Sequence, residues 1–335
     1  MTQPRSTLVS LDATPWYHVV SRCVRRAYLC GFDSHSGRNF EHRRAWIVDR
    51  LQQLAAVFAI DVAAYAVMSN HFHVVVRVDP ERALGWDRDE VLRRWMQLFT
   101  GPELVQRFRA HPEGLCAAEL ARVDLWVTTY RERLMDLSWF VRVLNESIAR
   151  QANAEDRVTG RFWEGRFKSQ ALLDEQAVLT AMAYVDLNPI RAKMAETPEA
   201  SAYTSVAERI AELSEEQDDA RNGPEDRAPL MPFDATGRLP TAIPFAFDDY
   251  LELVDATGRV IREDKRGYIP GETPSLLERL AIDPDQFIST TSRMLRQFGS
   301  AIGTPTHITD LCVVRQTRYL RGMRAARALF ERQAS

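Results

Sequence analysis

Apolar residues recur at two spacings in the first part of the chain, and each spacing predicts a different element. Between residues 43 and 58 they return every three or four positions, which is typical of an amphipathic helix. Between residues 71 and 78 the polar residues His71, His73 and Arg77 alternate with apolar ones, as in a strand. Residues 16–24 and 57–67 are rich in β-branched and other apolar residues and predict two more strands.

These elements follow one another as strand, helix, strand, strand, and residues 68–70 predict a tight turn that joins the last two strands. This order is compatible with a ferredoxin-like antiparallel sheet that has helices packed on it. We therefore predict an α+β fold with a mainly helical C-terminal extension. Further helices are predicted at residues 89–99, 117–127, 137–151, 174–189, 276–280 and 287–298, and residues 245–262 begin a second module.

Arginines repeat at three-residue steps near the end of the chain, and this repeat predicts a last helix with one broad positive face. These arginines are Arg315, Arg318, Arg321, Arg324 and Arg327.

The composition indicates a mostly globular chain, with 335 residues of which 45% are hydrophobic. A net charge of −3 does not indicate a nucleic-acid binder as a whole, so local basic patches have to decide that question. The four cysteines are scattered without a CxxC pair, which favours a reduced protein without a structural zinc site. Neither a secretion signal nor a membrane span is found, so we expect a cytoplasmic protein with no membrane partner.

The predicted strand at residues 71–78 carries the first candidate site. His71 and His73 are two positions apart, so their imidazoles project side by side from one face of the strand. Two adjacent imidazoles can share one divalent metal ion. The alternative is a strand that carries two partly exposed histidines without a ligand.

The stretch Met68-Ser69-Asn70-His71-Phe72-His73 resembles the metal motif of the HUH single-strand nucleases. It is most similar to the form found in the tyrosine transposases of small insertion sequences and in their REP-associated relatives. The resemblance implies an antiparallel sheet with packed helices, a bound Mg²⁺ or Mn²⁺ ion, and a tyrosine nucleophile on a later helix.

Residues 160–169 form the best local basic patch, and they resemble the element that precedes the nucleophile helix in the REP-associated transposases. Arg161, Arg166 and Lys168 stand against one acidic residue, Glu164, and Trp163 is available to stack on a base. If the segment is extended, alternate residues such as Arg161 and Trp163 share a face. Arg22 at the end of the first strand is a further candidate phosphate contact. A solvated strand is the alternative.

The predicted helix at residues 174–189 has Asp174 as its N-cap and ends near Pro189. Tyr184 to Ala192 matches the family element in which the tyrosine is the nucleophile and the fourth residue after it gives a polar oxygen to the metal. The resemblance therefore implies Tyr184 as nucleophile and Asn188 as third metal ligand, beside His71 and His73.

By this resemblance the chain is a transposase or endonuclease that cleaves and rejoins single-stranded DNA beside hairpins through a 5′-phosphotyrosine intermediate. Its DNA partner would be single-stranded or hairpin DNA from palindromic repeats, and the protein would act as a monomer or a homodimer. Three alternatives stay open: a non-cleaving DNA-binding regulator, a replication initiator or relaxase of the HUH class, and a small-molecule metalloenzyme.

The resemblance covers residues 14–210, which we predict to be the nuclease domain, with an insertion at residues 79–137. The acidic and polar composition of residues 211–244 indicates a linker. Residues 245–335 are predicted to form the C-terminal extension, to which the sequence assigns no role.

Overall fold

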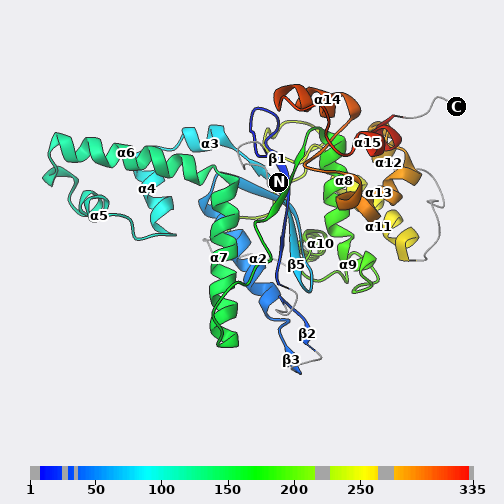
Figure 1. Ribbon diagram of the computed structural model, residues 1–335, viewed down its shortest axis with the longest axis horizontal. Coiled ribbons are helices and arrows are strands. Elements are labelled where there is room, and N and C mark those ends of the chain that lie inside the picture. Colours follow the sequence, from blue (N-terminus) through cyan, green and yellow to red (C-terminus); the bar gives the residue numbers. More distant parts are fainter. Residues whose placement is uncertain (1–7, 25–28, 34–36, 216–226, 263–274, 332–335) are drawn as a thin grey trace.

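The structure is a computed structural model that describes residues 8–24, 29–33, 37–215, 227–262 and 275–331. It is an α+β fold in which helices pack on a five-stranded sheet (Figure 1). The strands lie in the order β4, β5, β1, β6, β7. Their bounds are Trp16–Arg22 (β1), Ile60–Val67 (β4), His71–Val78 (β5), Lys168–Leu172 (β6) and Ala301–Ile302 (β7). Phe32–Asp33 (β2) and Arg38–Asn39 (β3) form a separate two-stranded ribbon.

The first four strands of this sheet confirm the ferredoxin-like prediction. β1 lies between β5 and β6 and pairs antiparallel with both, and β4 pairs antiparallel with β5. The purely antiparallel sheet that we predicted is nevertheless wrong at one edge, because β7 pairs parallel with β6. β7 comes from the C-terminal extension and is only two residues long, too short to produce a periodic pattern in the sequence.

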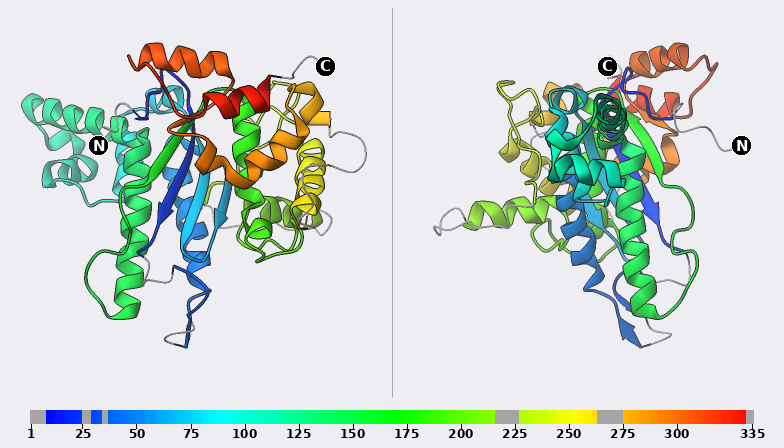
Figure 2. Two further views of the ribbon diagram at one scale, coloured as in Figure 1. Left: turned by 45° about the vertical axis from the view of Figure 1, so that its right-hand side comes forward. Right: turned by 90° about the vertical axis from the view of Figure 1, so that its left-hand side faces the viewer.

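Helices cover both faces of the sheet (Figures 1 and 2). α2 (Arg43–Val57) and α7 (Leu137–Asp156) pack together on one face. α8 (Glu175–Asp186), followed by the short α9 (Asn188–Arg191), covers the other. α2 buries the apolar stripe that its spacing predicts, including Ile47, Leu51 and Leu54. The sheet face under α8 is the one that carries the candidate site.

The predicted insertion forms a helical arm that extends away from the sheet (Figure 1). It contains α3 (Pro80–Leu84), α4 (Arg88–Met96), α5 (Glu103–Ala110), the 3₁₀ turn η1 (Pro112–Gly114) and α6 (Ala117–Leu134). Within the arm Trp95 is buried and stacks on Tyr130, with 4.4 Å between the ring centroids. This ring therefore packs inside the protein.

The described C-terminal helices pack on the sheet domain and share its hydrophobic core. They are α11 (Phe247–Arg262), α12 (Ser275–Arg279), α13 (Pro284–Gln297), α14 (Pro305–Val314) and α15 (Met323–Phe330). α13 lies against α8, and the Tyr250 hydroxyl of α11 donates to Asp186 Oδ2 of α8 at 2.6 Å. The division into domains at residues 14–210 and 245–335 stays a prediction.

The predicted linker at residues 211–244 is described in part. Residues 211–215 complete α10 (Ser205–Glu215), and residues 216–226 lie outside the described part of the chain. Beyond them the chain packs on the core: Met231 is buried, and its backbone N–H donates to the carbonyl oxygen of Val62 at 2.9 Å.

The predicted last helix with five arginines is wrong. α14 ends at Val314, and Gln316 has a φ of 50°, in the left-handed region that a right-handed helix cannot contain. Gly322, with a φ of 125°, precedes the start of α15 at Met323. The arginines therefore divide between a turn and a short helix and do not share one helical face.

Among the residues that the structure describes, no helix combines the length and the apolar run that a membrane crossing needs.

Candidate functional site

Three neighbouring strands bring a set of polar side chains to the sheet face under α8. In the register of the sheet, Arg22 lies opposite His71, and Gln170 lies opposite His18. Val20 lies opposite His73, and because alternate residues share a face, His18 is on the same face as His73. The rings of His71 and His73 are side by side, with 4.8 Å between their centroids, as their spacing on the strand predicts.

The Nδ1 atom of each candidate metal ligand, His71 and His73, has a hydrogen-bond partner. His73 Nδ1 lies 2.9 Å from His18 Nε2, and His71 Nδ1 lies 2.7 Å from Asn70 Oδ1. His18 Nδ1 in turn lies 2.9 Å from Gln170 Oε1. His73 Nε2 is buried, and no atom of the described residues hydrogen-bonds to it. An imidazole whose Nδ1 is engaged and whose Nε2 is bare is arranged as in protein metal ligands.

Burial holds the three imidazoles in the neutral form. Desolvation, together with the charge of Arg22 and Arg191, lowers the pKa of His71 to about 4. Desolvation also lowers the pKa of His18 to about 4, although the hydrogen bond to Gln170 acts in the opposite direction. The pKa of His73 lies well below its usual value, through desolvation first and then the neighbouring His18 and His71. The neutral ring is the form that binds a metal.

α8 delivers Tyr184 to this group of histidines. The carboxylate of Asp174 accepts from the backbone N–H of Ala177 at 2.9 Å, which confirms it as the N-cap. The Tyr184 ring packs edge-on against His73 and His18, with centroids 5.4 and 5.8 Å away. α8 itself ends at Asp186, earlier than predicted, and Pro189 lies in the first turn of α9. Tyr184 and Asn188 therefore belong to two successive helices.

Arg191, at the end of α9, connects these two helices, although it was not among the site residues that the sequence predicted. Its guanidinium carbon lies 4.2 Å from the centroid of the Tyr184 ring. It donates to Asn188 Oδ1 and to the carbonyl oxygen of Thr291 in α13. Desolvation raises the pKa of Tyr184, and the positive charge of Arg191 partly offsets this effect.

Two neutral imidazoles are donors that suit a divalent metal ion, and the amide oxygen of Asn188 would be the third donor that the sequence predicts. The described residues contain no group of three or more His, Cys, Asp or Glu side chains placed to hold a metal. A third protein ligand would thus be of another type, such as the amide oxygen of Asn188. That oxygen accepts from Arg191, but a carbonyl oxygen has a second lone pair that remains available.

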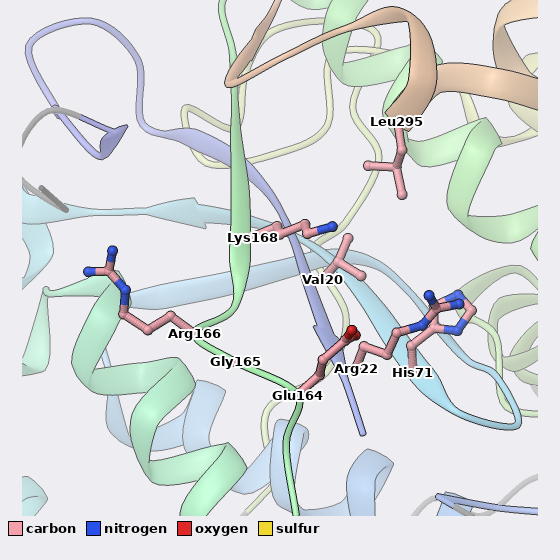
Figure 3. A pocket seen from close by; sticks show the side chains of 8 residues that line it. All are labelled: Val20, Arg22, His71, Glu164, Gly165, Arg166, Lys168 and Leu295. Carbon is pink, nitrogen blue, oxygen red and sulfur yellow. The ribbon is translucent and has the colours of Figure 1, made fainter. Parts of the chain in front are cut away.

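A basic cavity of about 250 Å³ opens beside His71. Arg22 and His71 project side by side, Lys168 reaches over Val20, and Arg166 points the other way from the same segment (Figure 3). Leu295 of α13 forms the opposite wall. Three of the predicted DNA contacts thus line one cavity next to the imidazole pair: Arg22, Arg166 and Lys168.

The other two predicted DNA contacts lie elsewhere. Residues 161–167 form a loop and not an extended strand, so the predicted alternation of faces does not apply. Arg161 Nε donates to the carbonyl oxygen of Trp163 at 2.8 Å, within this loop. Trp163 packs edge-on against Phe72 with 5.6 Å between centroids, and its indole N–H donates to the carbonyl of Asn145 in α7. Phe72 points to the sheet face opposite the histidines, so Trp163 does not face them.

Comparison with known proteins identifies no family for this chain. No family model matches the chain, and no curated protein matches it. Among solved structures it is similar to a REP-associated tyrosine transposase bound to a REP hairpin. That similarity has a TM-score of 0.34 and 12% identity and covers 64% of this chain and 92% of the other. The likeness is low by both measures, so we take the function from the geometry of this chain.

Proposed function

We propose that this chain is a metal-dependent single-strand DNA transposase or endonuclease that cleaves and rejoins DNA beside hairpins, with Tyr184 as its nucleophile. The packing of this one phenol against the histidine group supports the proposal most directly. A buried tyrosine beside a bare imidazole nitrogen and next to a basic cavity has the parts that phosphodiester cleavage needs.

Tyr184 is the nucleophile of the proposed reaction, and each bond that forms is matched by one that breaks. The Tyr184 oxygen forms a bond to phosphorus while the bond from phosphorus to the 3′ oxygen breaks. The phenol gives up its proton and the 3′ oxygen gains one, which leaves a 5′-phosphotyrosine and a free 3′-hydroxyl. Attack by a 3′-hydroxyl on the phosphotyrosine reverses these changes and rejoins strands without ATP.

Arg191 and the basic cavity prepare this step. The guanidinium over the Tyr184 ring favours the phenolate, because it lowers a pKa that burial raises. Arg22 and Lys168 would hold the phosphates of the strand beside the imidazole pair. A divalent ion, Mg²⁺ or Mn²⁺, held by His71, His73 and Asn188, would supply positive charge to the phosphate oxygens.

The test uses a labelled single-stranded oligonucleotide with a hairpin, and Mn²⁺. His71→Ala should abolish metal-dependent cleavage and weaken Mn²⁺ binding in calorimetry. His71 is preferable to the fully buried His73, because its removal leaves a smaller cavity. His111→Ala is the matched control, since that side chain is exposed in the helical arm.

Two results would count against the proposal. Unchanged Mn²⁺ affinity in the His71→Ala variant would remove the metal site. Tight binding of the hairpin by the wild-type protein without any cleavage would favour the non-cleaving regulator instead.

A further inference from the structure

A chain of hydrogen bonds starts at the backbone of the C-terminal extension and ends on His73. The carbonyl oxygen of Gly299, between α13 and β7, accepts from Gln170 Nε2 at 2.8 Å. Gln170 Oε1 lies 2.9 Å from His18 Nδ1, and His18 Nε2 lies 2.9 Å from His73 Nδ1. The three side chains are buried, and the two imidazole planes are nearly parallel, with 3° between them.

The Gly299 carbonyl determines which atom donates and which accepts in every other hydrogen bond of this series. A backbone carbonyl only accepts, so the Gln170 amide nitrogen must face Gly299 and its oxygen must face His18. An amide oxygen also only accepts, so His18 carries its hydrogen on Nδ1. A neutral ring with a hydrogen on Nδ1 has none on Nε2. His18 Nε2 therefore accepts, His73 Nδ1 donates, and His73 Nε2 is left with a lone pair.

The contacts of His18 and His73 explain why both imidazoles are neutral. His18 and His73 have no exposed surface, and the hydrogen bonds described for them go to Gln170 and to each other. No carboxylate takes part in these contacts, and the cation of Arg191 lies against Tyr184, which touches both rings. A buried imidazolium without a carboxylate partner is costly.

We propose that Gln170 and His18 are positioning residues that fix His73 in the tautomer with a bare Nε2, and that Gly299 makes the C-terminal extension part of the metal site. The ligand for that nitrogen would be a divalent cation, and in this respect the inference rests on the proposed function. His73 Nε2 is buried without a hydrogen-bond partner among the described residues. A polar atom in that situation is expected to have a ligand.

The position of the Gly299 carbonyl is itself fixed by backbone pairing. Gly299 N donates to the carbonyl oxygen of Arg321 at 3.0 Å, and Ala171 N donates to that of Ser300 at 3.0 Å. A Cβ atom at Gly299 would lie 3.2 Å from the Arg321 carbonyl oxygen, so the backbones are closely packed here. The short strand β7 thus places an acceptor next to Gln170, which would give the two-residue strand a function.

The tautomer can be read directly in the metal-free, full-length protein. Long-range ¹H–¹⁵N NMR correlations distinguish a histidine protonated on Nδ1 from one protonated on Nε2. A His73→Gln spectrum assigns the signals of His73. We expect wild-type His73 and His18 to carry hydrogen on Nδ1. A His73 ring with its hydrogen on Nε2 would overturn the inference, whatever the protein does with metal.

Gln170→Leu tests the effect on metal binding. It removes the acceptor of His18, so we expect His73 to show both tautomers and the Kd for Mn²⁺ to rise about 10- to 100-fold, as when outer partners of ligating histidines are lost. Gln52→Leu is the matched control, because it removes a glutamine hydrogen bond to Glu208 that joins α2 to α10 and involves none of the strands that carry the histidines. The control should keep the wild-type tautomer and Kd.

The remaining outcomes separate this inference from the proposed function. A Gln170→Leu variant with the wild-type tautomer and Kd would contradict the positioning role. A wild-type protein with the expected tautomer but no affinity for Mn²⁺ would overturn the proposed function, and with it the metal-binding role of the chain, while the tautomer itself stands. If Gln170→Leu does not fold, the wild-type spectrum still decides.

Discussion

The basic cavity makes a quantitative prediction about salt. In the double variant Arg22→Gln, Lys168→Gln, two cations next to His71 are removed, and neither position touches the hydrophobic core. Each phosphate contact on a single strand contributes about 0.7 to the slope of log K against log salt, so two contacts contribute about 1.4. The double variant should lose this much of the wild-type slope.

The same difference in slope also predicts how much affinity is lost when salt is raised. Raising salt from about 50 to about 200 mM is a fourfold change, which a slope of about 1.4 converts to roughly a sevenfold loss of affinity. The wild-type protein should therefore lose roughly seven times more affinity over that range than the double variant. Fluorescence anisotropy with a labelled single-stranded oligonucleotide measures both proteins at a series of salt concentrations.

Arg161→Gln is the control for this experiment. Its guanidinium is exposed but bonded to the carbonyls of Trp163 and Glu164 in its own loop, so its loss should change the slope less than that of either cavity residue. A double variant with the wild-type slope, or an Arg161→Gln variant that flattens it equally, would refute the assignment of the strand to this cavity.

Two further predictions concern stability. Tyr250→Phe removes a hydrogen bond to the fully buried Asp186 carboxylate, so the free energy of unfolding in urea should fall by about 1.5–3 kcal/mol in a single transition. Tyr319→Phe, at an exposed side chain, is the control and should not change this free energy. A separate early transition would mean that the C-terminal extension unfolds alone. Desolvation lowers the pKa of His18 from 6.5 to about 4, so the neutral ring contributes stability above pH 6.5 that is lost as the pH falls towards 4, on the order of 3 kcal/mol. A His18→Gln variant should lack this part of the pH dependence of the unfolding free energy. An identical dependence in both proteins would contradict the depressed pKa.

The parts of the fold that the sequence predicted well are those held by local patterns. The hairpin of β4 and β5 follows from the alternation at residues 71–78 and the turn before it. The start of α8 follows from the capping chemistry of Asp174. The pairing of His71 with His73 needs only the two-residue repeat of a strand. Each of these depends on residues close together in the chain.

The parts that the sequence did not predict depend on contacts across the chain. His18 and His73 are 55 residues apart and meet only through the register of β1 with β5. Gln170 joins them from β6, and the Gly299 carbonyl comes from the segment just before β7, a strand that is too short for a periodic signal. Arg191 reaches Tyr184 across the break between α8, which ends at Asp186, and α9. In a continuous helix Arg191 would share a face with Tyr184 but lie two turns away from it.

The most direct measurement is to map the covalent adduct. The protein is incubated with Mn²⁺ and a hairpin oligonucleotide that carries a single-stranded 5′ flank, and the DNA-linked peptide is identified by mass spectrometry. We expect the adduct on Tyr184, and its loss in Tyr184→Phe, which removes one oxygen and should keep the fold and the DNA affinity. The other candidates are less well placed, since Tyr17 Oη is bonded to Ser10 and Tyr130 is stacked on Trp95. An adduct on any other tyrosine, or full cleavage by Tyr184→Phe, would contradict the site.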